Sequence, residues 1–140
     1  MSAKVFVDTN VLVYAYDINA GSKRQTAQYV LLNLWQERSG AVSMQVLQEF
    51  YSTVIRKLVS PLAKDKARLI ANRFARWCVT TTPAEIRQAF RIEDEARINF
   101  WDAMIVAAAI KSGATRILSE DLNSGQVIAG IQIENPFAVS

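Results

Sequence analysis

Short apolar runs alternate with longer amphipathic segments along this chain. The short runs occupy about residues 4–8, 41–43, 79–81, 115–118 and 131–133. Helical spacing of apolar residues extends over about 21–38, 45–59, 63–76, 83–96 and 100–113, with a short helical piece within 10–16. Strands that alternate with helices in this way are typical of an α/β fold with a mostly parallel sheet.

Capping residues mark several of the expected boundaries. The segment from Thr82 to Glu85 has the pattern of a capping box, with Pro83 at the first helical position. Asn99 can cap the next helix, and Gly40 is a plausible C-terminal cap for the helix over 21–38. Because the chain has no repeat, low-complexity segment or linker, we expect a single domain over residues 1–140.

Composition favours a folded protein in a reducing compartment. The chain has 140 residues, of which 51% are hydrophobic, enough for one domain with a core. No apolar run approaches the roughly 20 residues that span a bilayer, and the start leads into a strand rather than a signal peptide. A single cysteine, Cys78, excludes an internal disulfide, so we expect a cytoplasmic protein with Cys78 in its core.

The chain contains no histidine. Ser–His–Asp and Cys–His catalysis and histidine-based zinc sites are therefore excluded. Acid–base chemistry has to come from carboxylates, lysine, tyrosine or metal-bound water.

Four acids stand where a carboxylate is costly unless it is paired or binds a metal. Asp8 ends the first apolar run, and Glu49 lies in an apolar helical segment. Asp102 lies in the first turn of a helix, and Asp121 follows the strand over 115–118. Ligands of open α/β sheets bind at the carboxyl edge of the strands, so these four segments are expected to face one edge. Four carboxylates there would suit Mg²⁺ or Mn²⁺ and a phosphate substrate.

Each of these acids also has an ordinary structural explanation. Asp8 suits a turn or a helix cap, Glu49 can lie on the solvated side of its helix, and Asp102 can serve the helix dipole. Asp121 can be a turn residue, and the adjacent Glu120 is an alternative candidate. The three tryptophans, Trp35, Trp77 and Trp101, are interpreted as packing residues rather than as platforms for nucleic-acid bases.

The charge balance is compatible with a nuclease. The chain has 16 basic and 13 acidic residues, a net charge of +3. Without the four acids, 16 basic residues face 9 acidic ones, a balance of +7. An acidic pocket within a basic surface attracts phosphates, although an ordinary basic protein has the same balance.

The motifs around these acids resemble those of PIN-domain ribonucleases, most closely the VapC toxins of type II (VapBC) toxin–antitoxin pairs. Four segments carry the resemblance in order: 5–14 (VFVDTNVLVY), 43–50 (SMQVLQEF), 100–109 (FWDAMIVAAA) and 118–123 (LSEDLN). The ending Asn135-Pro136-Phe137 is also typical of the family. The resemblance implies a three-layer α/β/α sandwich around a twisted, mostly parallel sheet of about five short strands.

The resemblance also implies the site. It makes Asp8, Glu49, Asp102 and Asp121 the catalytic, metal-binding acids, and so selects Asp121 over Glu120. Asn10 and Ser119 match polar positions that support them. Many members have histidine where Ser124 stands, a departure outside the metal ligands that bears on loop contacts or substrate preference.

The implied activity is RNA hydrolysis with Mg²⁺ or Mn²⁺, using metal-activated water as the nucleophile. The implied partners are a cognate VapB-type antitoxin, an RNA substrate such as tRNA, and a second copy in a homodimer. The apolar faces of the helices over 46–59 and 63–77 are candidate partner surfaces, or else core. Two other functions remain open: a nuclease of DNA or of RNA maturation without a toxin role, and a module that binds without cleaving.

Overall fold

A five-stranded sheet forms the centre of the protein. The computed structural model describes residues 3–138. The strands are β1 (Lys4–Val7), β2 (Gly40–Ala41), β3 (Ala114–Leu118), β4 (Val127–Ile128) and β5 (Ile131–Glu134). Their order is β2-β1-β3-β5-β4; β4 is antiparallel to β5 and the other pairs are parallel. The predicted mostly parallel sheet is confirmed.

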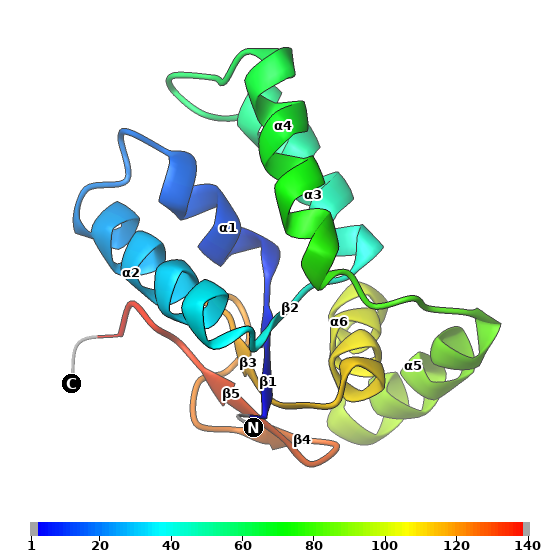
Figure 1. Ribbon diagram of the computed structural model, residues 1–140. Coiled ribbons are helices and arrows are strands. Elements are labelled where there is room, and N and C mark those ends of the chain that lie inside the picture. The colour runs from blue at the N-terminus through cyan, green and yellow to red at the C-terminus, as the bar shows by residue number, and fades with distance from the viewer. Residues whose placement is uncertain (1–2, 139–140) are drawn as a thin grey trace.

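Helices cover both faces of this sheet (Figure 1). The helices are α1 (Thr9–Tyr16), α2 (Ser22–Glu37), α3 (Met44–Arg56), α4 (Lys64–Phe74), the 3₁₀ turn η1 (Ala75–Trp77), α5 (Pro83–Ala96) and α6 (Phe100–Ser112). Helices α1 and α2 lie on one face, and α5 and α6 lie on the other, while α3 and α4 project beyond the carboxyl end of β1 (Figure 1). The expected three-layer α/β/α fold is confirmed.

Side-chain caps start the helices that carry the candidate acids. Asp8 caps α1, Ser43 caps α3 and Asn99 caps α6, each by accepting a backbone N–H from the first turn. The capping box of α5 is complete, with Thr82 and Glu85 bonding reciprocally. These caps fix where each helix begins relative to the strand or loop before it.

The core fills both interfaces between sheet and helices. Val5, Phe6 and Val7 of β1 and Ile117 of β3 are almost fully buried, because helices cover both faces of these central strands. Helix α6 is apolar nearly all round, as expected for a helix packed against the sheet and α5.

Two predicted local features are wrong, and one strand was not predicted. Residues 79–81 form no strand; Val42 and Cys78 make only an isolated parallel bridge, and no strand pairs with this segment along its length. Gly40 does not cap α2: Arg38 takes the left-handed position with φ 56°, and Gly40 belongs to β2. The two-residue strand β4 is too short to produce a periodic pattern, and the sequence did not predict it.

Among the described residues, no helix combines the length and apolar character that crossing a membrane requires.

Candidate active site

Asp8 is the most deeply buried of the four acids. It follows β1 directly, caps α1 and is only 7% exposed. One carboxylate oxygen accepts the Thr9 N–H at 2.8 Å, and the other accepts the hydroxyl of Ser119 at 2.7 Å. Two short hydrogen bonds thus fix the orientation of this carboxylate at the carboxyl edge of the sheet.

Ser119 and Asn10 connect Asp8 to the segment that carries Asp121. The fully buried Ser119 hydroxyl accepts the backbone N–H groups of Asp121 and Leu122 at 3.1 and 3.3 Å. The Asn10 amide donates to the Asp121 carboxylate at 3.1 Å, and its carbonyl accepts the Glu120 N–H at the same distance. Two segments about 110 residues apart in sequence are therefore joined beside Asp8.

Glu49 approaches the same edge from α3. It is exposed, as one explanation of its sequence context expected. Its carboxylate accepts the Thr9 hydroxyl at 3.1 Å and the Gln45 amide at 3.0 Å. Because Thr9 adjoins Asp8, this side chain is held close to the first acid despite its exposure.

Asp102 lies in the first turn of α6 and is partly buried. Its carboxylate accepts the side-chain amide of Asn99 at 2.9 Å, and Asn99 in turn caps its backbone N–H at 2.9 Å. Gln45 reaches the carbonyl of the adjacent Trp101 at 3.3 Å, which connects α3 to the start of α6.

Burial and mutual repulsion raise the pKa of two of the acids. Burial raises the pKa of Asp8 from 3.8 to about 6, and the negative charges of Asp121 and Glu49 add to this rise, while hydrogen bonds from Ser119 and Thr9 oppose it. Burial also raises the pKa of Asp102, again with contributions from Asp121 and Glu49 and against the Asn99 hydrogen bond. Asp121 and Glu49 therefore repel both Asp8 and Asp102, and a positive charge placed among these carboxylates would be stabilised.

Glu120 is directed elsewhere. Its carboxylate accepts the Tyr14 hydroxyl at 2.6 Å and pairs with Lys23 at 2.5 Å. Burial favours a higher pKa for Glu120, but the hydrogen bonds from Lys23 and Tyr14 prevail and lower it. Glu120 is thus held by α1 and α2, whereas Asp121 is held beside Asp8.

The donor chemistry of this edge suits a hard divalent cation. Every candidate ligand is an oxygen, the preference of Mg²⁺ and Mn²⁺; the chain has no histidine, and its one cysteine, Cys78, is not among the candidates. Within residues 3–138, however, no three carboxylate or thiol side chains are grouped closely enough to hold an ion as they stand. Glu49 is hydrogen-bonded instead to Thr9 and Gln45, and Asp102 to Asn99. The chemistry fits, and binding would require these side chains to move together.

Three neighbours of this edge were not predicted from sequence. Thr9 and Gln45 hold Glu49, and their local context is that of ordinary helix residues. Trp101 was interpreted as a packing residue; its ring does pack edge-on against Phe100, but the residue is 64% exposed beside Asp102. The informative feature is a large exposed aromatic residue next to a candidate acid, and the exposure of a residue is not evident from the sequence alone.

Cys78 is half-buried, and burial raises the pKa of its thiol. A raised thiol pKa disfavours the reactive thiolate. The prediction that Cys78 is not a nucleophile agrees with this environment.

A family model described as the PIN domain matches residues 5–127. A comparison with curated proteins finds no match in sequence. Solved structures similar to the chain include a toxin–antitoxin complex from Klebsiella pneumoniae, with a TM-score of 0.70, 17% identity and coverage of 97% of this chain and 100% of that one.

Two further solved structures are similar. DNA-bound VapBC from Salmonella typhimurium has a TM-score of 0.63 and 19% identity, covering 96% of this chain and 99% of its own. VapC20 from Mycobacterium tuberculosis, described as a toxin that cleaves the sarcin–ricin loop, has a TM-score of 0.58 and 20% identity, covering 84% and 90%. At these identities the likeness establishes the shared fold.

Proposed function

The chain belongs to the PIN domain family, and from that premise we propose that it is a metal-dependent endoribonuclease, the toxin of a VapBC-type pair, formed by one domain over residues 1–140. The observation that carries the proposal is the group of four acids at one sheet edge, in which burial and the charges of Asp121 and Glu49 raise the pKa of Asp8 to about 6. Such an arrangement is unfavourable for the free protein and favourable for binding a cation.

Asp8, Glu49, Asp102 and Asp121 would hold the Mg²⁺ or Mn²⁺. The cation supplies the Lewis acidity that makes water nucleophilic at neutral pH and offsets charge on the phosphate. Ser119 and Asn10 keep the Asp8 carboxylate and the Asp121 segment in position through their hydrogen bonds. No side chain needs to form a covalent intermediate, in keeping with the lack of histidine.

RNA is the proposed substrate because a similar structure, VapC20, is described as cleaving the sarcin–ricin loop. Hydrolysis by water leaves a 5′-phosphate and a 3′-hydroxyl and does not use the RNA 2′-hydroxyl. Trp101 offers an exposed ring beside Asp102 on which a base can stack. A particular RNA such as tRNA is a family expectation that only sequencing of cleaved RNA can test.

A VapB-type antitoxin is the proposed partner, since similar solved structures are toxin–antitoxin complexes. An apolar cavity of about 300 Å³ between α1, α2 and α4 offers a docking surface for an apolar segment; its lining includes Tyr16, Leu31, Leu32 and Phe74. On α4, Leu69 is exposed, Ile70 is core, and Phe74 is buried but lines this cavity. We also propose a homodimer, which the molar mass in solution tests.

Induction in cells, followed by sequencing of RNA 5′ ends, tests the activity and its chemistry together. We expect discrete cleavage sites with 5′-phosphate ends, growth arrest that the neighbouring antitoxin gene relieves, and neither effect with Asp8→Asn. Exposed Asp94→Asn on α5 is the matched control and should behave as the native protein does. Ends with 2′,3′-cyclic phosphates would contradict hydrolysis by water, and cleavage by Asp8→Asn would contradict the assigned site.

The native protein and its Asp8→Asn variant also distinguish the two alternative functions, a nuclease without a toxin role and a module that binds without cleaving. Cleavage without growth arrest or antitoxin rescue would favour RNA maturation, and cleavage of DNA alone would favour a deoxyribonuclease. Binding of RNA without metal-dependent cleavage would make the chain a binding module.

A further inference from the structure

A second cavity lies at the opposite end of the sheet from the four acids. Its volume is about 640 Å³, within the range of sites for small molecules. Lys4, at the start of β1, lines it, whereas Asp8 follows the end of the same strand. Helix α6 spans the two sites: Asp102 lies in its first turn and Lys111 in its last, nine residues or about 14 Å apart.

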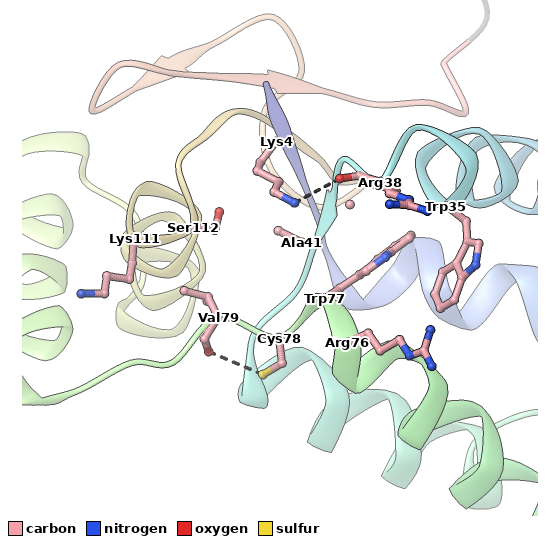
Figure 2. A pocket seen from close by; sticks show the side chains of 11 residues that line it. Lys4, Trp35, Arg38, Ala41, Arg76, Trp77, Cys78, Val79, Lys111 and Ser112 are labelled. Carbon is pink, nitrogen blue, oxygen red and sulfur yellow. Dashed lines mark hydrogen bonds between the residues drawn. The ribbon is translucent and has the colours of Figure 1, made fainter. Parts of the chain in front are cut away.

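The charged side chains that line this cavity are all basic. Lys4, Arg38, Arg76 and Lys111 come from four separate elements, and no acid is among the lining residues. Neither salt bridge found within residues 3–138 involves any of them. In Figure 2 the ammonium of Lys111 is turned away, while that of Lys4 points to the Arg38 carbonyl, 3.1 Å distant. Arg38 and Arg76 are the remaining cations of the lining that could meet an anion.

One wall of the cavity is a fixed aromatic ring. A Cβ atom added at Gly40 would lie 2.6 Å from atoms of the Trp77 indole, so the ring packs directly on the backbone of β2. The ring of Trp35 lies 5.3 Å from it between centroids, tilted by 40° (Figure 2). The close approach of Trp77 therefore explains why residue 40 is a glycine. Both indoles border the cavity that the basic side chains line.

Helix ends explain only part of this arrangement. Arg38, Arg76 and Lys111 stand at C-terminal ends of α2, η1 and α6, where cations offset the helix dipole. The dipole does not account for their gathering around two indoles without any carboxylate. Guanidinium groups that bond phosphate bidentately, beside a ring on which a base stacks, are the elements of nucleotide recognition.

We propose that this cavity binds a nucleotide unit, with its phosphate on Arg38 and Arg76 and its base beside the pair of indoles formed by Trp35 and Trp77. The unit is either a free nucleotide or one residue of a single-stranded RNA. The proposal is independent of the metal chemistry at the acidic edge, because binding can be measured in EDTA, where metal-dependent cleavage does not occur.

Tryptophan fluorescence of the Trp101→Phe protein reports on the cavity, since Trp35 and Trp77 are then the only indoles. The protein is titrated in EDTA with 5′-AMP, with a single-stranded RNA pentamer and with inorganic phosphate. The Arg38→Gln/Arg76→Gln pair removes the proposed phosphate ligands. The Arg87→Gln/Arg91→Gln pair removes the same charge from the exposed face of α5 and is the control.

We expect 5′-AMP or the pentamer to quench the fluorescence more tightly than phosphate alone. The Arg38/Arg76 pair should weaken binding at least about tenfold, as loss of charge-assisted bonds does, and the control pair by less than about twofold. Binding of 5′-AMP identifies a free nucleotide as sufficient, and binding of the pentamer alone identifies RNA as the source.

Three results would overturn the proposal. They are equal weakening by the two arginine pairs, phosphate binding as tight as that of 5′-AMP, and no quenching by either nucleotide probe. A fourth contradicting result would come from a poly-glutamate peptide added as a further probe: if it bound more tightly than 5′-AMP and the pentamer, the cavity would be assigned to an acidic protein segment instead. Melting temperatures of the variants verify that each remains folded.

Discussion

Asp8 combines burial with a charge that the metal-free fold accommodates poorly. The backbone of Thr9 and the hydroxyl of Ser119 supply neutral donors, and no cation among the described residues pairs with it. A neutral donor lowers the cost of a buried carboxylate less than an opposite charge does. The residue is therefore a point where binding a cation and stabilising the fold are linked.

Replacing Asp8 with asparagine should stabilise the metal-free protein at neutral pH. Because folding raises the pKa of Asp8 from 3.8 to about 6, the folded protein binds more protons than the unfolded chain between these values. The free energy of unfolding therefore falls as the pH rises through this window. In EDTA at pH 7, Asp8→Asn should raise the free energy of unfolding by about 1–3 kcal/mol, measured by urea denaturation.

The gain should vanish near pH 4, where the native carboxyl is protonated. Asp94→Asn, on the exposed face of α5, should change stability little at either pH. A gain of equal size at pH 4 and pH 7, or a loss at pH 7, would show that the charge of Asp8 does not destabilise the fold.

Trp101 exposes its ring beside Asp102, where it could contact the proposed RNA substrate. It is 64% exposed, so its removal should leave the melting temperature nearly unchanged. Stacking contributes about 1–3 kcal/mol per base, and Trp101→Ala should therefore raise KM for RNA about tenfold with a smaller change in kcat. Trp101→Phe should retain part of the affinity.

Tyr29→Ala, which removes an equally exposed ring from α2, should leave KM unchanged. If Trp101→Ala lowered kcat with KM intact, the ring would position Asp102 rather than bind substrate.

At the scale of elements, the site depends on how the loop after β3 is held against the start of α1. Asn10 makes this connection through the Glu120 N–H, the Asp121 carboxylate and a longer contact of 3.5 Å to the Ser119 hydroxyl. The Ser124 hydroxyl attaches the same loop to the C-terminal segment by accepting the Asn135 N–H at 3.2 Å.

Asn10→Ala should release this loop without disturbing the sheet. We expect faster hydrogen exchange at the Glu120 amide, a loss of about 1–2 kcal/mol in the free energy of unfolding, and a lower kcat. Asn123→Ala, which removes an exposed amide from the same loop, is the control and should do none of these. Unchanged exchange at Glu120 in Asn10→Ala would mean that other contacts order the loop.

The sequence predicted the elements whose signals are local. The capping box of Thr82 and Glu85, the cap at Asn99 and the apolar runs of β1 and β3 each lie within a few residues, and the structure has them. The prediction of a strand over the β-branched segment 79–81 was wrong, because a segment with strand propensity forms a strand only when another strand pairs along its length. Only one isolated bridge forms there. Gly40 was mistaken for a cap because its packing partner, Trp77, is 37 residues away.

In the candidate site, too, features with a local sequence signal were predicted and contacts between distant residues were not. Strand ends and helix starts indicated which acids face the carboxyl edge, and the family motifs selected them. The contacts from Asn10 to Asp121 and from Thr9 to Glu49 join residues 111 and 40 positions apart, which no local pattern encodes. The exposure of Trp101 depends on the packing of α5 and α6 and was likewise beyond a local pattern.

At the scale of the whole molecule, negative charge is gathered at one end of the sheet and positive charge lines a cavity at the other. The balance outside the four acids is +7, which favours attraction of a polyanion. Phosphates repelled by bare carboxylates at the acidic edge would be accepted there once a divalent cation is bound.

Titration of Mn²⁺ by calorimetry, paired with cleavage of one RNA by the same samples, is the most direct measurement of whether the four acids form a metal site. The native protein and Asp94→Asn should bind Mn²⁺ equally and cleave until EDTA is added. Asp102→Asn should weaken Mn²⁺ binding at least about tenfold and abolish most cleavage, while remaining folded. Unweakened Mn²⁺ binding by Asp102→Asn, or cleavage that persists in EDTA, would contradict a metal site built from these acids.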